Sequence, residues 1–312
     1  MKTKLDYSCR GASNDMLTDN YFVKLDGRGV LAVSGEDRAN FLQGLVSNDV
    51  HLISETVSIY AALLTPQGKF LCDFFMSNGQ SEFLLECDSK LLPGLEQKLR
   101  MHKLRSKINI QDVSDQFDVF AGFGSSIHSA IGSTGVSGHT IKVSNGLMMV
   151  DPRLAAMGIR MILTKNALPT IGNLKECDSN DYELLRITLG VPDGLQDMQS
   201  QKTILLEAGF DELKGICWKK GCYMGQELTA RTKYRGLIKR RLIPVSVDGT
   251  LPEPGTFIMF GEKEAGEIRS GVGNAAMALM RLNILEEWSR LGGELTAGSS
   301  CVMPQKQSWM NF

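Results

Sequence analysis

"KKGCYMGQE", residues 219–227, places one cysteine between two glycines, directly after two lysines and before a Gln–Glu pair. A cysteine reacts as its thiolate, and neighbouring cations or a helix N-terminus lower the pKa of the thiol. Gly221 and Gly225 would let backbone N–H groups approach a ligand closely. The following residues predict a helix that begins near Gly225 and carries Glu227 in its first turn. The stretch therefore indicates either an anion pocket with an activated Cys222 or a structural cysteine buried in a tight turn.

Length and composition describe an ordinary folded protein. The chain has 312 residues, of which 43% are hydrophobic and 22% charged, and its net charge is -1. That length predicts roughly two domains, each large enough for its own core. The balanced charge argues against a global field for nucleic acid or anionic membrane, and the apolar runs are far shorter than the ~20 residues of a bilayer span. We expect no membrane partner, and a cytoplasmic location in a bacterium or the mitochondrial matrix in a eukaryote.

The cysteines suggest thiols that stay reduced. The chain has seven cysteines and four histidines, and no two cysteines form a C-x-x-C pair. This pattern fits neither a disulfide framework nor a zinc site, although Cys217 and Cys222 could pair under oxidation. We expect no metal site made by this chain alone. An iron–sulfur cluster shared with a partner would need fewer cysteines from it.

The order of strand and helix patterns predicts an α+β protein. Residues 21–35 predict two strands with a hairpin turn at Asp26–Gly27, and residues 56–77 predict two strands joined by Thr65–Gly68. A helix is expected within residues 179–194, ended by a Gly-x-Pro sequence. After Arg241, short strand patterns are separated by Gly, Pro and Asp-Gly turns, which indicates a small all-β sandwich or barrel.

The octapeptide "KGCYMGQE" closely resembles the K-G-C-Y-x-G-Q-E signature of the YgfZ family. These folate-binding proteins are related to the T-protein, the aminomethyltransferase of the glycine cleavage system. Four weaker segments match in the same order: "FLQGLVSNDV" (41–50), "ALLTPQGKFLCDFF" (62–75), "DPRLAAMGIR" (151–160) and "LLRITLGVPDG" (184–194). The resemblance spans about residues 31 to 241 and looks closest to the α-proteobacterial and mitochondrial branch.

The resemblance implies a T-protein-like folate-binding fold. Residues 1–240 would form an α+β region of two lobes, the middle one at roughly residues 100–180. One lobe would be ferredoxin-like, and residues 241–312 would form a small C-terminal β-barrel.

The resemblance also implies a function. The chain would be a folate-dependent accessory protein for iron–sulfur cluster assembly or repair, with tetrahydrofolate as its ligand. It would support iron–sulfur enzymes such as tRNA-modifying radical-SAM enzymes, and its partners would be iron–sulfur carrier or target proteins. The expected working residues are Cys222 and Lys220, and the rest of the signature would help to bind folate: Gly221, Tyr223, Gly225, Gln226 and Glu227.

Three charged residues outside the signature are candidates for folate binding. Asp73 lies in the apolar strand sequence "KFLCDFFM", which by resemblance aligns with the T-protein strand that carries an acidic residue near the folate. There it could accept hydrogen bonds from a pterin, or it could stand exposed on an edge strand. Arg153 and Arg186 could grip a folate carboxylate, because arginine binds carboxylates bidentately. Each arginine could instead be a structural ion-pair residue, as most arginines are.

"RTKYRGLIKRR", residues 231–241, holds six Lys or Arg and no acidic residue. This basic run could contact a polyglutamate tail, RNA or an acidic protein, or it could be a solvated strand face. Two alternatives to the assembly role stay open. One is a folate-dependent aminomethyltransferase of the glycine cleavage type. The other is a non-catalytic module that docks RNA or protein through residues 231–241. Whether the chain is an enzyme is left open, with an assembly factor favoured.

Overall fold

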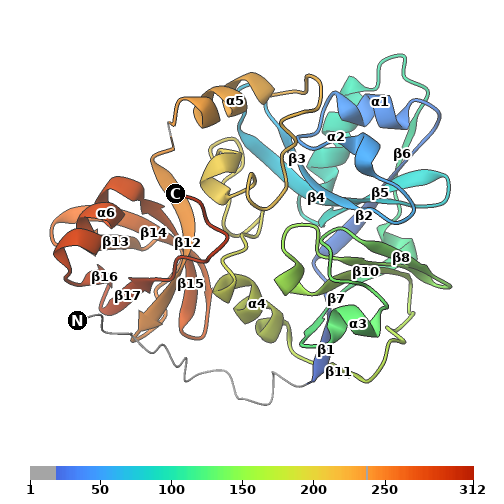
Figure 1. Ribbon diagram of the computed structural model, residues 1–312. Helices are drawn as coiled ribbons and strands as arrows, with labels where there is room; N and C mark the ends of the chain where they lie inside the picture. Colours follow the sequence, from blue (N-terminus) through green and yellow to red (C-terminus); the bar gives the residue numbers. More distant parts are fainter. Residues whose placement is uncertain (1–18, 237) are drawn as a thin grey trace.

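The computed structural model describes residues 19–236 and 238–312, which form two open sheets and one closed barrel (Figure 1). The five-stranded sheet has the order β3-β4-β5-β2-β6, and with its helices it is called the first lobe below. Its elements are β2 (Arg28–Ser34), α1 (Arg38–Gln43), η2 (Val50–Leu52), β3 (Ile59–Leu64), β4 (Phe70–Asn78), β5 (Glu82–Asp88), α2 (Leu92–His102) and β6 (Asn109–Asp112).

The six-stranded sheet has the order β11-β1-β7-β10-β9-β8 and forms the middle lobe. Among its strand pairs only β1 and β11 run parallel. Its elements are β1 (Asn20–Lys24), η3 (Ser114–Gln116), β7 (Phe117–Gly124), α3 (Ile127–Ala130), β8 (Thr140–Val143), β9 (Gly146–Val150), η4 (Ala155–Met157), β10 (Ile159–Thr164), β11 (Leu174–Glu176) and α4 (Ser179–Thr188).

The C-terminal part closes into a six-stranded barrel in the order β12-β15-β14-β13-β16-β17. A connecting segment with η5 (Leu205–Ala208) and α5 (Gln226–Tyr234) leads into it. The barrel elements are β12 (Arg240–Asp248), β13 (Phe257–Phe260), β14 (Lys263–Val272), β15 (Ala275–Arg281), α6 (Leu282–Leu291), β16 (Leu295–Ala297) and β17 (Ser300–Pro304). None of the helices in the described part of the chain combines the length and apolar character of a membrane span.

The α+β class and the C-terminal barrel are confirmed, and so is the β3–β4 hairpin around the Thr65–Gly68 turn. The hairpin predicted at Asp26–Gly27 is wrong. Both strands exist, but β1 pairs with β7 and β11, whereas β2 pairs with β5 and β6 in the other sheet. A local turn sequence specifies a reversal of the chain. It does not specify whether the two flanking strands become neighbours.

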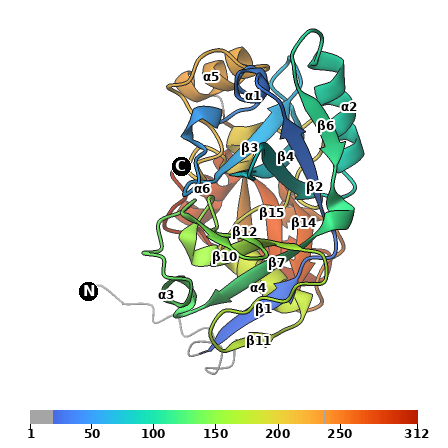
Figure 2. The same cartoon turned by 90° about the vertical axis from the view of Figure 1, so that its right-hand side faces the viewer.

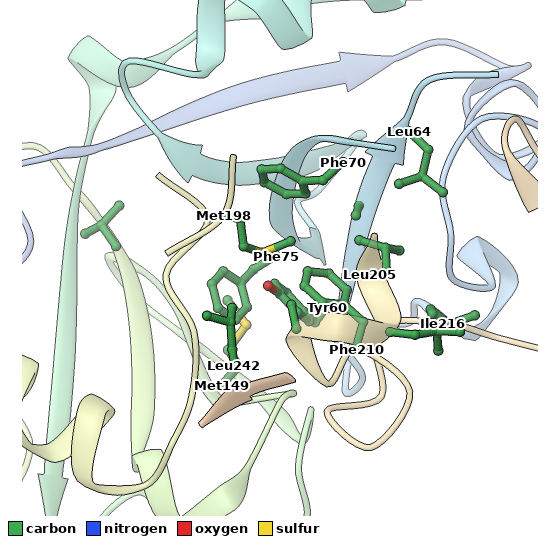
Figure 3. Close-up of a cluster of buried hydrophobic side chains, with 14 of the residues drawn as sticks. Tyr60, Leu64, Phe70, Phe75, Met149, Met198, Leu205, Phe210, Ile216 and Leu242 are labelled. Atoms are coloured by element: carbon green, nitrogen blue, oxygen red, sulfur yellow. The ribbon is translucent and has the colours of Figure 1, made fainter. Parts of the chain in front are cut away.

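The two sheets, the connecting segment and the barrel meet on one apolar cluster, called the central cluster (Figure 3). Tyr60 and Phe75 enter it from the first lobe, Met149 from the middle lobe, Phe210 from the connecting segment and Leu242 from the barrel. Burial of such side chains stabilises each by about 1.5–3 kcal/mol relative to exposure. The cluster therefore fixes how the three parts face one another.

Candidate functional site

The segment that carries Cys222 lies between α5 and the connection from α1 to β3. The backbone N–H of Cys217 donates to the carbonyl oxygen of Ser47 (3.0 Å), and that of Met224 donates to the carbonyl oxygen of Gly44 (3.1 Å). These two bonds hold residues 217–224, called the cysteine loop below, against the first lobe at both ends.

Lys220 anchors the cysteine loop from the inside. Its side chain is buried, and Nζ donates to the carbonyl oxygens of Val46 (2.7 Å) and Asn48 (2.6 Å). Burial lowers the pKa of Lys220 to about 8, and the opposing effect of Asp49 is smaller. The ammonium also lies 5.1 Å from the ring centroid of Tyr223. Lys220 thus has backbone carbonyls as its hydrogen-bond partners, which gives it an anchoring role in addition to any chemistry.

Cys222 is exposed, in contrast to the buried structural cysteine considered above. Six cysteines lie in the described residues, and all six are free thiols. Among them, Cys222 alone is exposed. The seventh, Cys9, lies outside the described residues. The neighbouring Gly221 is also exposed, and a Cβ atom added there would meet no heavy atom within 4 Å. A large partner can therefore approach this thiol.

Gly225 fixes the end of the cysteine loop. Its φ of +82° favours glycine, and an added Cβ would lie 2.6 Å from the carbonyl oxygen of Thr65 and 3.1 Å from Cα of Gly68. The loop and the β3–β4 turn therefore touch backbone to backbone. α5 begins directly after Gly225, as predicted, with Glu227 exposed in its first turn.

Gln226 and Tyr223 complete the signature. The amide Oε1 of Gln226 accepts a hydrogen bond from the backbone N–H of Tyr223 (3.3 Å). The Tyr223 ring is buried in the central cluster, and burial raises the pKa of its hydroxyl to about 12. That hydroxyl has no hydrogen-bond partner among the described residues. The Tyr223 ring therefore points into the protein from the loop that presents Cys222 outward, while the Gln226 side chain bonds back to the backbone of that loop.

Asp73 lies in the interior of the first lobe and not on an edge strand. It belongs to β4, which pairs with β3 on one side and β5 on the other, and it is only 6% exposed. The Tyr60 hydroxyl donates to its Oδ2 (2.7 Å). Burial raises the pKa of Asp73, and the nearby Arg28 opposes that shift. Gly194 lies so close that an added Cβ would stand 1.8 Å from Oδ1.

Arg153 and Arg186 are both buried and both ion-paired within the protein. Arg153 binds Asp151 through Nε (3.1 Å) and Nη2 (2.8 Å), and its guanidinium lies over the Phe75 ring, 4.8 Å from the centroid. Arg186, on α4, binds Asp197 (2.7 Å) and the half-buried Glu183 of the same helix (2.9 Å). The structural ion-pair role is thus the one each arginine has here, and only Arg153 lies near the Tyr60–Asp73 pair.

A buried charge network that the sequence reasoning missed connects the two lobes. Glu86 on β5 binds Arg160 on β10 through two hydrogen bonds of 2.8 and 2.9 Å, and it also binds Arg28. Burial alone would raise the pKa of Glu86, but the two arginines outweigh it and hold that pKa at about 2. The signal available was Glu86, which stands between apolar residues in the strand sequence "EFLLECD", because a charge in such a setting needs a buried partner.

The basic run is partly neutralised by acidic residues. Three of its six cations form ion pairs: Lys233 with Asp211, Arg240 with Glu207 and Arg241 with Glu212. Arg231, Arg235 and Lys239 are exposed, and their side chains have no partner in the described part of the chain. Leu237, within the run, lies outside the described residues.

The carboxylate of Asp73 is enclosed by its neighbours. The Tyr60 hydroxyl donates to one of its oxygens, and the backbone of Gly194 lies close to the other. A ligand that needs both oxygens as acceptors would have to displace these two contacts. Within residues 19–236 and 238–312, no three His, Cys, Asp or Glu side chains are grouped to hold a metal ion.

Known proteins resemble the chain in three ways. Residues 239–312 match the family model described as "CAF17, C-terminal beta-barrel domain". The mitochondrial iron–sulfur cluster assembly factor IBA57 of Homo sapiens is 33% identical over 275 residues, which cover 82% of this chain and 76% of that protein. The same factor of Mus musculus is 32% identical over 280 residues, which cover 83% and 76%.

Among solved structures, the glycine cleavage system aminomethyltransferase T from Bartonella henselae superposes with a TM-score of 0.73. The match covers 94% of this chain and 86% of that chain at 13% sequence identity. At that identity the likeness concerns the fold, and it confirms the T-protein-like fold class. Taken with the two IBA57 proteins, the comparisons show that the chain belongs to the family of CAF17/IBA57-type iron–sulfur cluster assembly factors, built on the aminomethyltransferase fold.

Proposed function

We propose that the chain is an accessory factor for the assembly or repair of iron–sulfur clusters, with Cys222 as its working thiol. The observation that carries the proposal is an exposed thiol held on a firmly anchored loop in a chain of this family. Thiolates are the usual protein ligands of iron–sulfur clusters. With one exposed cysteine in the described residues, this chain would need a partner to supply further ligands for any cluster it contacts.

Tetrahydrofolate is the proposed small-molecule ligand, as in the YgfZ type of protein that the signature resembles. Asp73 is the proposed partner of the pterin, since a buried carboxylate with a raised pKa can accept or share a proton with ring N–H groups. Binding would require Gly194 to move away from Asp73. Of the two candidate arginines, Arg153 lies nearer to Tyr60, and it would have to release Asp151 in order to bind a folate carboxylate.

Glycine-cleavage aminomethyl transfer is not part of the proposal. The relatives that are 32–33% identical are named as assembly factors, while the likeness to an aminomethyltransferase is one of fold at 13% identity. The proposed partners are iron–sulfur carrier or target proteins, with tRNA-modifying radical-SAM enzymes as one client class. The proposed location depends on the source organism: the mitochondrial matrix in a eukaryote or the cytoplasm in a bacterium. The names of the two relatives say that those proteins are mitochondrial.

The test pairs a functional assay with folate titration. Cells that lack the endogenous factor receive the wild type, Cys222→Ala or the matched control Cys217→Ala, and the activity of a client iron–sulfur enzyme is measured. We expect loss of rescue only with Cys222→Ala. Equal rescue by all three proteins would refute a working role for Cys222.

Anaerobic calorimetry with tetrahydrofolate separates the ligand from the thiol. We expect binding to the wild type and to Cys222→Ala, and much weaker binding to Asp73→Asn. No heat of binding with the wild type would reject folate as the ligand while leaving the assembly role intact.

A further inference from the structure

The turn between α2 and β6 exposes apolar side chains that the core does not use. Leu104 is 88% exposed and Met101 is 61% exposed. α2 packs on the first lobe through Leu92, Leu95 and Leu99. The helix therefore does not need Met101 or Leu104 to hold it against the core. The turn lies at the upper end of the molecule in both views (Figures 1 and 2).

Leu104 also has an unusual backbone. Its φ of +41° lies in the left-handed region, which is uncommon for a bulky residue and costs on the order of 1–3 kcal/mol. An exposed leucine in such a conformation brings no packing benefit to the isolated chain. A role in contact with another molecule would explain both features.

Cations without partners lie beside these two side chains in the sequence. Lys98, Lys103 and Arg105, together with the imidazole of His102, form no ion pair or side-chain hydrogen bond within the described residues. The acidic residues nearby are already engaged: Glu96 by Arg100, Glu36 by Lys107 and Asp37 by the backbone N–H of Lys107. The surface thus has a net positive charge around an apolar centre.

Two open hollows flank the same turn. One of about 680 Å³ is lined by Asp37, Leu104, Arg105 and Ser106. The other, of about 490 Å³, is lined by Pro93, Glu96, Gln97, Arg100 and Met101. Protruding apolar side chains beside hollows fit the interlocking surface of a protein partner better than the plane of a lipid headgroup layer. Residues 98–107 contain no Phe, Tyr or Trp, so they lack the large aromatic side chains on which nucleic-acid bases stack.

We propose that this surface, formed by Met101, Leu104, Lys98, Lys103 and Arg105, docks an acidic segment of a partner protein that carries apolar side chains. Leu104 would insert into the partner's apolar patch, and the cations would meet its carboxylates around the rim. The assignment stands on the surface itself and does not depend on the chemistry proposed for Cys222.

α1 places this surface within reach of the cysteine loop. Asp37, the residue before α1, lines the larger hollow, while Gly44, the residue after α1, accepts a hydrogen bond from Met224 of the cysteine loop. A six-residue helix is only about 9 Å long. A protein docked on the α2–β6 turn would therefore extend over α1 to Cys222.

The first experiment places a photo-cross-linking amino acid at position 104 of the full chain in the cells that produce it. The matched control carries it at Leu168, which is 65% exposed on the middle lobe. We expect an adduct at position 104 alone, which mass spectrometry maps to an acidic, apolar-containing segment of one protein. Adducts only with lipid or RNA, or equal adducts at both positions, would overturn the proposal.

The second experiment measures the affinity of that purified protein for defined variants. We expect Leu104→Ser to weaken binding about tenfold or more, and Lys103→Glu with Arg105→Glu to weaken it further and flatten its salt dependence. Lys202→Glu, an exposed lysine elsewhere, should bind like the wild type. Unchanged affinity in the position 103–105 variants would refute the docking surface.

Discussion

The cysteine loop and the surroundings of Asp73 present their reactive groups in opposite ways. Cys222 faces solvent, while Lys220 behind it is buried and bound to backbone carbonyls. Asp73 is sealed by Tyr60 and Gly194 in the interior. The first arrangement suits a macromolecular partner, which can reach only what is exposed. The enclosed arrangement around Asp73 suits a small molecule, which would have to displace Gly194 in order to reach the carboxylate.

The two regions are also held together by different forces. The cysteine loop depends on close backbone contacts, of which Gly225 against Thr65 is the tightest. The interior depends on buried charges, with Glu86 shared between Arg28 and Arg160. Steric contacts and buried charges respond differently to substitution and to pH, so the difference can be tested directly.

The largest effect is expected at the buried charge network. Glu86→Gln should lower the free energy of unfolding by about 3–5 kcal/mol, because it leaves two arginines buried without a charged partner. Chemical denaturation measures the change. Glu96→Gln, at an exposed pair with Arg100, is the control and should cost less than about 1 kcal/mol. Similar losses in both variants would contradict the structural role of the network.

Next comes the steric contact of the cysteine loop. Gly225→Ala should destabilise the protein by about 2–3 kcal/mol, because the new methyl group meets the Thr65 carbonyl and the φ is unfavourable for alanine. Gly221→Ala, with open space around it, should change stability by less than about 0.5 kcal/mol. Equal free energies of unfolding for the two alanine variants would contradict a close contact between Gly225 and the β3–β4 turn.

A moderate effect on the pH dependence of folding stability is expected from Lys220 in alkaline solution. Its folded pKa of about 8 is below the ordinary lysine value, so the unfolded chain binds more protons between pH 8 and 10. Stability should therefore rise with pH across this window, by about 2 kcal/mol from this residue. The measurement compares denaturation of the wild type with Lys220→Gln, whose curve should lack the rise. Parallel curves would show that Lys220 titrates normally.

The smallest effect on stability is expected at Asp73. Its raised pKa means that the native state binds more protons than the unfolded state just above the ordinary aspartate pKa. The contribution of Asp73 to the free energy of unfolding is therefore lost as pH rises through its pKa in the folded state. Asp73→Asn can still accept the Tyr60 hydrogen bond and should remove that pH dependence. Denaturation between pH 4 and 8 checks this, and a stability profile identical to wild type would count against a shifted Asp73.

Much of the fold could be predicted from the sequence, because its signals are local. The Thr65–Gly68 turn and the helix after Gly225 are each specified within a few residues. The C-terminal barrel follows from repeated turns between short strands. The partner of each strand is not a local property, which explains why β1 and β2 were assigned to one hairpin and lie in two sheets.

The sequence names candidate site residues, but it does not specify their surroundings. The signature contains both Lys220 and Cys222, and the structure places the first in a buried and the second in an exposed environment. The pairing of Glu86 with Arg160 spans 74 residues and two sheets, so no spacing rule could reveal it. Leu104 was missed because an exposed leucine in a basic segment looks the same in sequence as a buried one.

The contact between Gly68 and Gly225 has a consequence for protein engineering. A Cβ at Gly68 would lie 3.0 Å from the Gly225 carbonyl oxygen, and one at Gly225 would lie 3.1 Å from Cα of Gly68. The β3–β4 turn with Gly68 and the segment that ends at Gly225 thus pack closely against each other, although they are more than 150 residues apart in the sequence. Transplanting the octapeptide into another scaffold without its matching "TPQG" turn would carry over the thiol but lose the shape that presents it.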